Sequence, residues 1–595
     1  MLNIILASLV LPLVIQFFLL IFSPSFILYW GVFLGLLFLL FKYFPIHKKT
    51  FALESIIFLL LFSFLYLVGQ KWIYFHPSGE HIRDYSLLSA SIANPLNPNE
   101  PWMSYEPNHY YIYWYKWGAS LSYLFHLDGE QTYVLSFCLS FTLYIGLCFF
   151  FLNKIMKIEK TKAFALSLLP AFLSNLDGIL SIFRENFHWW GPSRVINGAI
   201  TEFPMWTFLQ GDYHPHFPSL ILSVLFLYLS FAALKLNAPR YNRLVYLSLV
   251  FVLFYRVYMI ANPWDVIFLA ISFGGILLKE FLFENPKEFQ LSRSQNLVLL
   301  LLVFLILSST FLYPPLIQTN IKFAIVTKEV GRSTLKELLS HWGLWILSLV
   351  LIFIASLKGR RFKNFDHNLL YFFILSFLLI LIPEIIFVDD PYGPPNERMN
   401  FIFKMYMPAW TMMGIFVCII FERSFSPKMF WTFFLSIFFI GNIFNFKVIP
   451  QRINEYSAYE KRLDYADREH PGIKNLILKF REFKRDTTVQ SAKSAYDYTS
   501  FIGTMANKDL YLGWINHMMI FVPDYSILMN RQSIIRAIYE EGDCLRKKQY
   551  LDQIGAQYLI LSMQEKKDYP LSLSTDFSCL KTIISVGDNF IYQTN

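Results

Sequence analysis

The stretch QTYVLSFCLSFTLYIGLCFFFL (residues 131–152) runs for 22 residues without a single charged side chain. A helix of about 20 apolar residues is long enough to cross the hydrocarbon core of a bilayer. Further apolar runs of about 17 to 22 residues recur along the chain. These runs are too long for the strands of an outer-membrane barrel, which need about 9–11 residues. The sequence therefore predicts a multi-spanning helical membrane protein.

Composition supports this class and argues against others. The 595 residues are 55% hydrophobic and 16% charged, whereas soluble proteins carry roughly 25% charged residues. The net charge of +9 is spread over short clusters between apolar runs, which argues against nucleic acid as a partner. The sequence contains no P-loop, GxSxG or HExxH motif, so ATP hydrolysis and the common hydrolase mechanisms have no support.

The apolar runs predict about thirteen membrane spans, and the short loops between them alternate in charge. The first run lacks a basic start and leads into a second, which favours a span over a cleaved signal peptide. Loops rich in Lys and Arg face the cytoplasm. We therefore expect a protein of the cell (inner) membrane whose N-terminus is cytoplasmic and whose C-terminal part is extracytoplasmic. The predicted spans are 4–22, 25–42, 51–70, 131–152, 163–183, 217–235, 244–261, 265–280, 296–314, 343–357, 367–388, 401–421 and 429–446. The long loops predicted on the outer face are 71–130, 184–216, 314–342 and 389–400.

The composition changes abruptly near residue 450. PGIKNLILKFREFKR is typical of a helix, TVQSAKSAY and AQYLILS of strands, and a final hairpin is expected to end at NFIYQT. We therefore expect an all-α polytopic membrane domain (1–449) followed by a small extracytoplasmic α/β domain (450–595). Its loop YLGWINHM (511–518) is placed to fold over a membrane site. Cys544 and Cys579 can pair if this part faces an oxidising compartment.

The segment GEHIRDYSLLSASIANPL (79–96) predicts an amphipathic helix along the membrane interface. Glu80, Arg83 and Asp84 share one face at i, i+3 and i+4. Asp84 is a candidate catalytic or metal-binding carboxylate, and a solvated face with an internal ion pair is the alternative. The following stretch NHYYIYWYKWG (108–118) contains Tyr110 and Tyr111, and its rings suit either an interfacial aromatic belt or stacking on a sugar.

The stretch GDYHPH (211–216) lies at the start of an apolar run. Pro215 disfavours a helical conformation at His214, and an extended backbone would point Asp212, His214 and His216 to one side. One carboxylate and two imidazoles are a plausible ligand set for a divalent metal (Zn²⁺, Mn²⁺ or Mg²⁺). The alternative is that the histidines cap the next span or donate to loop carbonyls.

Several cations and polar residues lie at the predicted outer ends of spans. A cation within a span is costly and usually has a partner or ligand. Arg398 and Lys404 could hold a lipid phosphate at headgroup depth, or they could form an internal network with Glu384 or Asp265. The remaining candidates for this face are Arg194, Glu202, Arg256, Asn262, Trp264, Asp390 and Asn400.

Four motifs occur in order: NHYYIYWYKWG, TEFPMWTFLQGDYHPH, NPWD and RMNFIFKMYMPAW. Over residues 75 to 410 the chain resembles the YYY membrane-protein family, an uncharacterised archaeal and bacterial family named for its tyrosine run. The layout is similar to that of GT-C membrane glycosyltransferases, which use polyprenyl-phosphate sugars on the outer face. In those enzymes an acidic residue in the first long outer loop is catalytic, which implies a matching role for Asp84.

These observations favour a membrane glycosyltransferase that moves a sugar from a polyprenyl-phosphate donor to a lipid, glycan or protein acceptor. Asp84, with Glu80, would be catalytic, and the stretch 212–216 would bind metal or orient the donor. The donor phosphate is assigned to Arg194, Arg256, Arg398, Asn400 and Lys404, with support from Tyr110, Tyr111, Glu202, Asn262, Trp264, Asp265, Glu384 and Asp390. The alternatives are a lipid or polysaccharide transporter (flippase) and a non-catalytic protein of envelope assembly.

Overall fold

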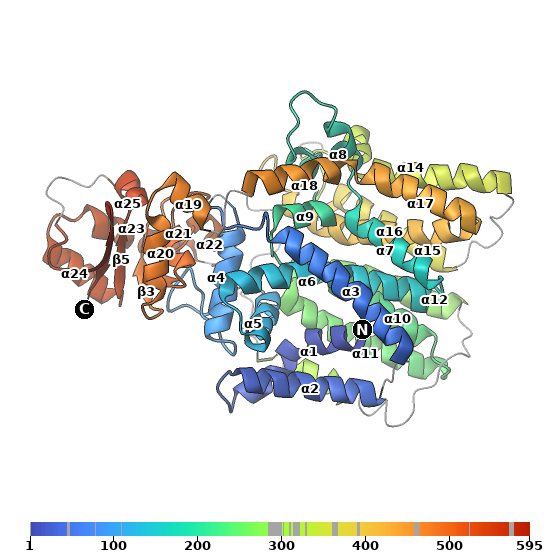
Figure 1. Ribbon diagram of the computed structural model, residues 1–595, viewed down its shortest axis with the longest axis horizontal. Helices are drawn as coiled ribbons and strands as arrows, with labels where there is room; N and C mark the ends of the chain where they lie inside the picture. Colours follow the sequence, from blue (N-terminus) through green and yellow to red (C-terminus); the bar gives the residue numbers. More distant parts are fainter. Residues whose placement is uncertain are drawn as a thin grey trace.

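The structure of the chain is a computed structural model that combines a helical bundle with a smaller C-terminal region built around a sheet. The two parts lie at opposite ends of the long axis (Figure 1). The structure describes residues 2–43, 48–77, 79–108, 110–283, 300–301, 303–308, 311–312, 322–327, 330–359, 367–389, 393–456, 463–522, 524–569 and 576–594.

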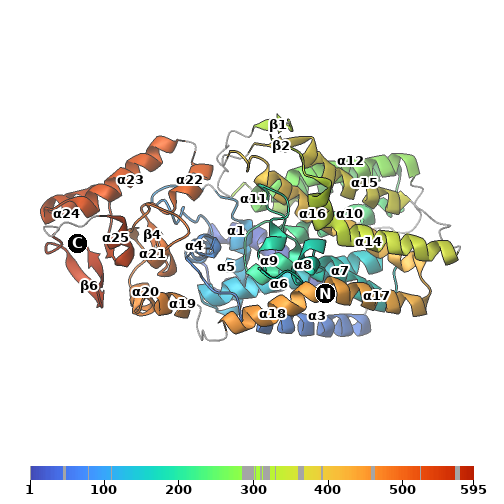
Figure 2. The same cartoon turned by 90° about the horizontal axis from the view of Figure 1, so that it is seen from above.

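Long apolar helices run side by side in the bundle (Figures 1 and 2). Within the described ranges, seven are long and apolar enough to cross a membrane, or up to eight if the bent pair α17 (Pro427–Gly441) and α18 (Ile443–Tyr456) forms one span. The predicted total of thirteen stays a prediction. The seven are α1 (Leu2–Leu19), α2 (Phe26–Tyr43), α6 (Gly129–Phe150) with its π-helical extension η1 (Phe151–Ile155), α11 (Arg240–Ala261), α14 (Leu335–Gly359), α15 (His367–Leu381) with the 3-10 turn η4 (Ile382–Glu384), and α16 (Met399–Ser424).

The other predicted spans differ in length and continuity. The run 163–183 is interrupted: α7 (Lys160–Phe172) ends, and Asn175 caps a new helix, α8 (Leu176–Ser181), by accepting a hydrogen bond from the Gly178 N–H. Three runs form the apolar helices α3 (Lys48–Gly69), α10 (Ser219–Leu234) and α12 (Val266–Phe283). The predicted span 296–314 lies mostly outside the described residues.

Burial separates the centre of the bundle from its rim. In the 18-residue apolar stretch of α16, 94% of the length is buried, and in that of α6 the buried share is 89%. In the corresponding stretch of α2 it is only 22%. An extensive apolar surface that no protein covers marks a contact with membrane or partner. This pattern fits helices whose outer faces contact lipid.

Short helices lie between the long helices of the bundle, and α4 among them contacts the C-terminal region. They are α4 (His81–Ala93), α5 (Tyr113–Phe125), η2 (Gly191–Ser193), α9 (Pro204–Gln210) and η3 (Pro263–Asp265). The apolar side chains of α4, Ile82, Tyr85 and Leu88, all face the protein core and are buried. The C-terminal region covers this helix: the Tyr85 hydroxyl donates to Asn507 Oδ1 at 2.9 Å.

The C-terminal region contains a five-stranded mixed sheet of order β4-β3-β5-β7-β6. β3 is parallel to β4 and β5, with Val489 opposite Leu559, whereas β7 is antiparallel to β5 and β6. The strands are β3 (Thr487–Val489), β4 (Asp509–Leu510), β5 (Tyr558–Leu561), β6 (Lys581–Val586) and β7 (Asn589–Gln593). Around them lie α19 (Asp464–Glu469), α20 (Ile473–Arg481), α21 (Phe501–Met505), α22 (Ile515–Phe521), α23 (Tyr525–Glu540), α24 (Cys544–Gln553) and α25 (Met563–Asp568).

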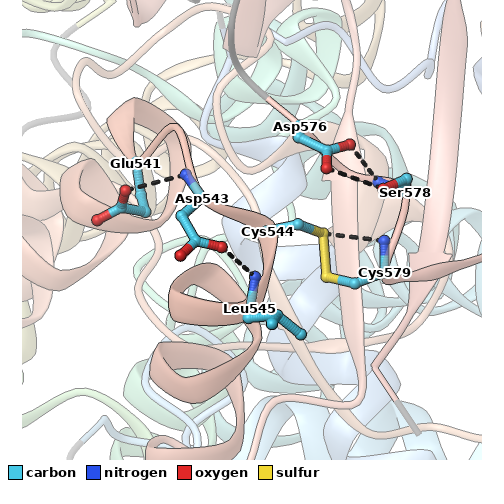
Figure 3. Close-up of a disulfide and its surroundings, with 7 residues drawn as sticks. All are labelled: Glu541, Asp543, Cys544, Leu545, Asp576, Ser578 and Cys579. Carbon is cyan, nitrogen blue, oxygen red and sulfur yellow. Dashed lines mark hydrogen bonds between the residues drawn. A yellow bond between two sulfur atoms is a disulfide. The ribbon is translucent and has the colours of Figure 1, made fainter.

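A disulfide joins Cys544, the first residue of α24, to Cys579 just before β6 (Figure 3). The Cys579 N–H donates to Cys544 Sγ at 3.0 Å, and Asp543 caps α24 by accepting from the Leu545 N–H. The three other cysteines, Cys138, Cys148 and Cys418, are buried and free. The pairing supports an oxidising environment around this region.

Backbone hydrogen bonds join the outer loop of the bundle to the C-terminal region. The N–H of Ser104 donates to the Leu510 carbonyl at 2.8 Å, and the N–H of Gly513 donates to the Trp102 carbonyl at 2.8 Å. A Cβ at Gly513 would lie 2.5 Å from the Trp102 ring, so only glycine permits this approach. The predicted loop 511–518 therefore does pack against the bundle, with its second half forming the start of α22.

Candidate active site

Asp84 lies in the first turn of α4 and is 1% exposed. Its Oδ1 accepts a hydrogen bond of 2.5 Å from the Tyr115 hydroxyl of α5. His214 approaches the same oxygen through Nδ1 at 3.4 Å. Helix α4, helix α5 and the turn before α10 thus meet at one carboxylate, as expected if the predicted outer segments form a single site.

Asp212 lies close enough to Asp84 for the two carboxyl groups to influence each other's ionisation. Burial opposes ionisation of Asp84, but His214 and the hydrogen bonds from His214, Asp212 and Tyr115 lower its pKa to about 2. Burial and the charge of Asp84 raise the pKa of Asp212 well above its ordinary value. Asp84 Oδ2 and Asp212 Oδ1 are buried and lack a donor when both groups are ionised. A proton on Asp212 supplies that donor, so this pair carries one negative charge.

A chain of side chains leads from Asp84 through His214 to the tyrosine run. His214 Nε2 lies 3.1 Å from the Tyr110 hydroxyl, which donates to the Tyr111 hydroxyl at 3.0 Å. The two tyrosine rings stack with centroids 4.0 Å apart. We name Asp84, Asp212, His214, Tyr110 and Tyr115 the Asp84 cluster.

The extended form expected for residues 212–216 ends at His214, where a turn begins. Gly211 ends α9 in the left-handed region at φ +83°, and a turn then begins, in which the Phe217 N–H donates to the His214 carbonyl at 3.1 Å. Because the chain turns here, the side chains do not alternate as they would in a strand. Asp212 meets Asp84, whereas His216 Nε2 lies 3.6 Å from Glu202.

The predicted metal ligands are not assembled as one set. In the parts of the chain that the structure describes, no group of three or more His, Cys, Asp and Glu could hold a metal ion. The donors Asp212, His214 and His216 are divided between two carboxylates, Asp84 and Glu202, so their arrangement does not fit a single cation. A divalent metal stays a prediction from the sequence, and no step below depends on one.

Glu202 forms a second polar group next to the Asp84 cluster. Its carboxylate accepts from the Thr207 hydroxyl at 2.9 Å and lies 3.8 Å from the guanidinium of Arg194. Burial raises the pKa of Glu202. Burial, followed by the charges of Lys404 and His214, lowers the pKa of His216 well below its ordinary value, so this imidazole is neutral. Arg194 also stacks on the Trp190 ring at 5.1 Å.

Lys404 lies one turn into α16 and is 4% exposed. Among the described residues its ammonium has no hydrogen bond and no carboxylate within 4.0 Å, and it lies over the Phe403 ring at 4.6 Å. The His216 ring packs on the same phenylalanine at 4.4 Å. The carboxylates whose charge reaches Lys404 are those of Asp265, Glu80 and Glu202. Lys404 is thus a buried cation beside both carboxylate groups without a bonded partner of its own.

Other predicted site residues have different partners. Arg398 pairs with Glu384 at 3.1 Å, as expected for the internal network, and its phosphate role stays a prediction. Arg256 lies over the Phe311 ring at 4.4 Å. Asp265 and Asn262 are buried around η3, and Trp264 is partly buried. Asn400 lies in the first turn of α16, and Asp390 lies outside the described residues.

The C-terminal region adds residues that the sequence did not single out. The Tyr496 hydroxyl donates to Glu80 Oε1 at 3.3 Å and lies 3.0 Å from His517 Nε2. Phe521 of α22 packs edge-on against Tyr110 with ring centroids 4.7 Å apart. The only signal in the sequence was the loop YLGWINHM, which contains His517. Tyr115, inside the tyrosine-rich stretch, was likewise not distinguished from its neighbours.

The bundle of long apolar helices defines the chain as a multi-pass membrane protein. Residues 6–378 and 365–413 match the family described as uncharacterised membrane protein (DUF2298), and the chain belongs to that family. This confirms the family resemblance drawn from the tyrosine run. The match includes Asp84, His214 and Lys404 and ends before the C-terminal region. A comparison with curated proteins gives no significant match.

Proposed function

We propose that the chain is a glycosyltransferase that moves a sugar from a polyprenyl-phosphate donor to an acceptor hydroxyl at the outer face of the membrane. One observation carries the proposal: a continuous series of side chains joins Asp84 to the buried cation Lys404. His214 contacts Asp84, the His214 and His216 rings lie 5.2 Å apart, and His216 packs on the Phe403 ring that Lys404 covers. A glycosyl transfer from a phosphate donor needs both a proton acceptor and positive charge near the leaving phosphate.

In the proposed reaction the acceptor oxygen attacks the anomeric carbon of the donor sugar. The bond from that carbon to the phosphate oxygen breaks, and polyprenyl phosphate leaves with the electron pair. The acceptor proton passes to Asp84, which is oriented by Tyr115 and His214. Lys404 stabilises the negative charge that develops on the leaving phosphate. A buried ammonium is effective in this role because the local dielectric constant is low.

A lipid-linked donor suits the depth of the site. Lys404 lies one turn from the start of α16, a candidate membrane span, and lipid phosphates lie at the ends of such spans. The chain has no nucleotide-binding motif, and a lipid-linked donor needs none. The acceptor, a lipid, glycan or protein, would reach the site between the bundle and α22.

We also propose that the site and the C-terminal region face outward from the cell membrane, with the N-terminus in the cytoplasm. The Cys544–Cys579 disulfide supports this orientation, because such bonds persist in oxidising compartments. The basic loops of the bundle support it independently, since Lys and Arg concentrate on the cytoplasmic side.

The proposal can be tested with purified full-length protein in liposomes and a labelled polyprenyl-phosphate sugar. Replacing the proton acceptor with Asp84→Asn is expected to lower the transfer rate by about 10²–10⁴-fold. Lys404→Gln is expected to cost about 10²–10³-fold. Matched controls are Asp177→Asn, whose carboxylate pairs with Arg184 instead, and Lys447→Gln, whose ammonium lies over Phe187.

Activity at the wild-type level in both site variants would contradict the proposal. Movement of the intact donor across the bilayer, without cleavage of the sugar–phosphate bond, would assign the chain to transport. A chelator arm in the same assay shows whether a divalent metal contributes. Loss of rate with chelator and recovery with Zn²⁺, Mn²⁺ or Mg²⁺ would restore the metal prediction.

A further inference from the structure

Helix α4 borders a second polar space, on a different face from Asp84. An open pocket of about 210 Å³ lies between α4, the first residue of α6 and the C-terminal region. Its polar lining consists of Ser89, Arg481, Arg485, Asn507 and Lys508, together with the backbone of Gly129. We name this space the α4–α6 pocket. Ser89 follows Asp84 by five residues, which on a helix places the two side chains well apart around the axis.

Three cations line the α4–α6 pocket, and no carboxylate does. The acids that orient these cations lie behind them: Glu130 accepts from Arg481 Nη2 at 2.5 Å, and Asp509 accepts from Arg485 Nη2 at 2.5 Å. Lys508 is 2% exposed and is held by the carbonyl of Lys484 at 3.1 Å. The pocket surface is therefore positive, although each cation is anchored.

Hydrogen-bond donors remain available in the α4–α6 pocket. In the described chain, Arg481 uses Nε and Nη2 but not Nη1. Asn507 accepts from Tyr85 and Ser89 through Oδ1, and its amide Nδ2 has no bonded partner. Asn507 has a φ of +60° in the left-handed region, a conformation that asparagine tolerates better than most residues. Its amide group is thus fixed at the pocket wall.

The α4–α6 pocket lies at the boundary of the membrane. Gly129 begins α6, and this helix continues as a candidate span to Ile155. Ile92 and Phe483, both partly buried, supply an apolar edge. Cations beside an apolar edge at the end of a span are the combination that recognises a phosphate group at headgroup depth.

We propose that the α4–α6 pocket binds a phosphate group, as the ester in an anionic phospholipid headgroup or as free phosphate. Arg481, Arg485 and Lys508 supply the charge, and Asn507 supplies a neutral donor. A bound phosphate would bridge the C-terminal region, which carries the cations, to α4 and α6 of the bundle. The site does not depend on glycosyl transfer, because none of its residues belongs to the Asp84 cluster.

The test uses full-length protein purified in a neutral detergent and stripped of lipid. Phosphatidylglycerol or inorganic phosphate is titrated in, and bound molecules are counted by native mass spectrometry alongside thermal unfolding. Arg485→Gln is expected to weaken binding about tenfold or more, because a charge-assisted contact to phosphate is lost. Ser89→Asp is expected to weaken binding similarly by placing a negative charge in the pocket.

The controls are Ser533→Asp, which adds the same charge at an exposed serine of α23 outside the pocket, and Arg536→Gln, an exposed arginine that pairs with Glu540. Both should bind within a few-fold of wild type. Tight binding of phosphatidylglycerol that millimolar phosphate does not displace identifies a lipid as the source. Stabilisation by inorganic phosphate without lipid retention identifies free phosphate. The proposal is overturned if Arg485→Gln and Ser89→Asp bind both probes as the controls do.

Discussion

Replacing Arg398 should destabilise the fold rather than remove a ligand for the donor. Arg398 is 6% exposed, and its Nη1 donates to Glu384 at 3.1 Å and to the Pro383 carbonyl at 2.9 Å. Glu384 also accepts from the backbone N–H and the hydroxyl of Ser333 at 2.8 and 2.7 Å. Arg398→Gln leaves this buried carboxylate without its cation. Breaking such a pair costs about 3–5 kcal/mol of unfolding free energy.

The double variant separates this ion pair from other effects. Glu384→Gln leaves the guanidinium of Arg398 with one carbonyl as its acceptor, so a loss of similar sign is expected. Arg398→Gln with Glu384→Gln leaves neither charge behind. The double variant should therefore lose less than the sum of the single losses, with a coupling energy of about 0.5–3 kcal/mol.

The assay is denaturant unfolding in detergent, combined with the transfer rate per folded molecule. We expect Arg398→Gln to lower the unfolding free energy while each folded molecule keeps its rate within a few-fold. Lys404→Gln should show the opposite pattern. If Arg398→Gln instead keeps the unfolding free energy of the wild type and loses transfer activity, the structural role of Arg398 is refuted. Arg398 would then be a ligand of the donor phosphate.

Two further changes test other parts of the chain. Burial lowers the pKa of Lys116 in α5 from 10.5 to about 7, so the folded protein releases this proton while the unfolded chain keeps it. The unfolding free energy of the wild type should rise by about 1.4 kcal/mol per pH unit above pH 7. Denaturant unfolding at about pH 7 and about pH 9 should show this rise in the wild type and not in Lys116→Met. The same pH dependence in both proteins would refute the prediction. Removing the disulfide with Cys544→Ser and Cys579→Ser opens a link between residues 35 apart, at a cost of about 4 kcal/mol. Reductant should lower the unfolding free energy of the wild type by the same amount as the double substitution does, and should leave the double variant unchanged. A wild type whose unfolding does not respond to reductant would contradict the estimate.

The helices were predictable where a local property decides them. Residues 131–152 form α6 because length and apolar character suffice for a long buried helix. The run 163–183 looks equally continuous, yet the chain breaks before Asn175. Its amide donates to the Pro192 carbonyl at 2.6 Å while its Oδ1 caps α8. That partner lies 17 residues away, so hydropathy of the run alone gives no sign of it.

The sequence indicated which residues belong to the candidate site, but only partly which of them contact one another. Asp84 and His214 were selected because the predicted topology places their segments on one face, and their atoms do meet. The sequence left two roles open for Arg398 and Lys404: binding a lipid phosphate, or an internal network with Glu384 or Asp265. Only the fold shows that Arg398 takes Glu384 and leaves Lys404 without a carboxylate. Which charged side chains pair depends on the distances between them in the fold, and the number of residues that separate them in the sequence does not determine those distances.

The position of α4 depends on the C-terminal region as much as on the bundle. No side chain caps the N-terminus of this helix, and Asn507 holds Tyr85 and Ser89 from the far side. The Leu510 N–H donates to the Pro101 carbonyl at 2.7 Å, so the loop after α4 pairs with the same region. Losing residues beyond 450 would therefore uncover Asp84 and leave buried backbone groups without partners, at a cost for each. The C-terminal region is thus a wall of the candidate active site rather than a separable attachment.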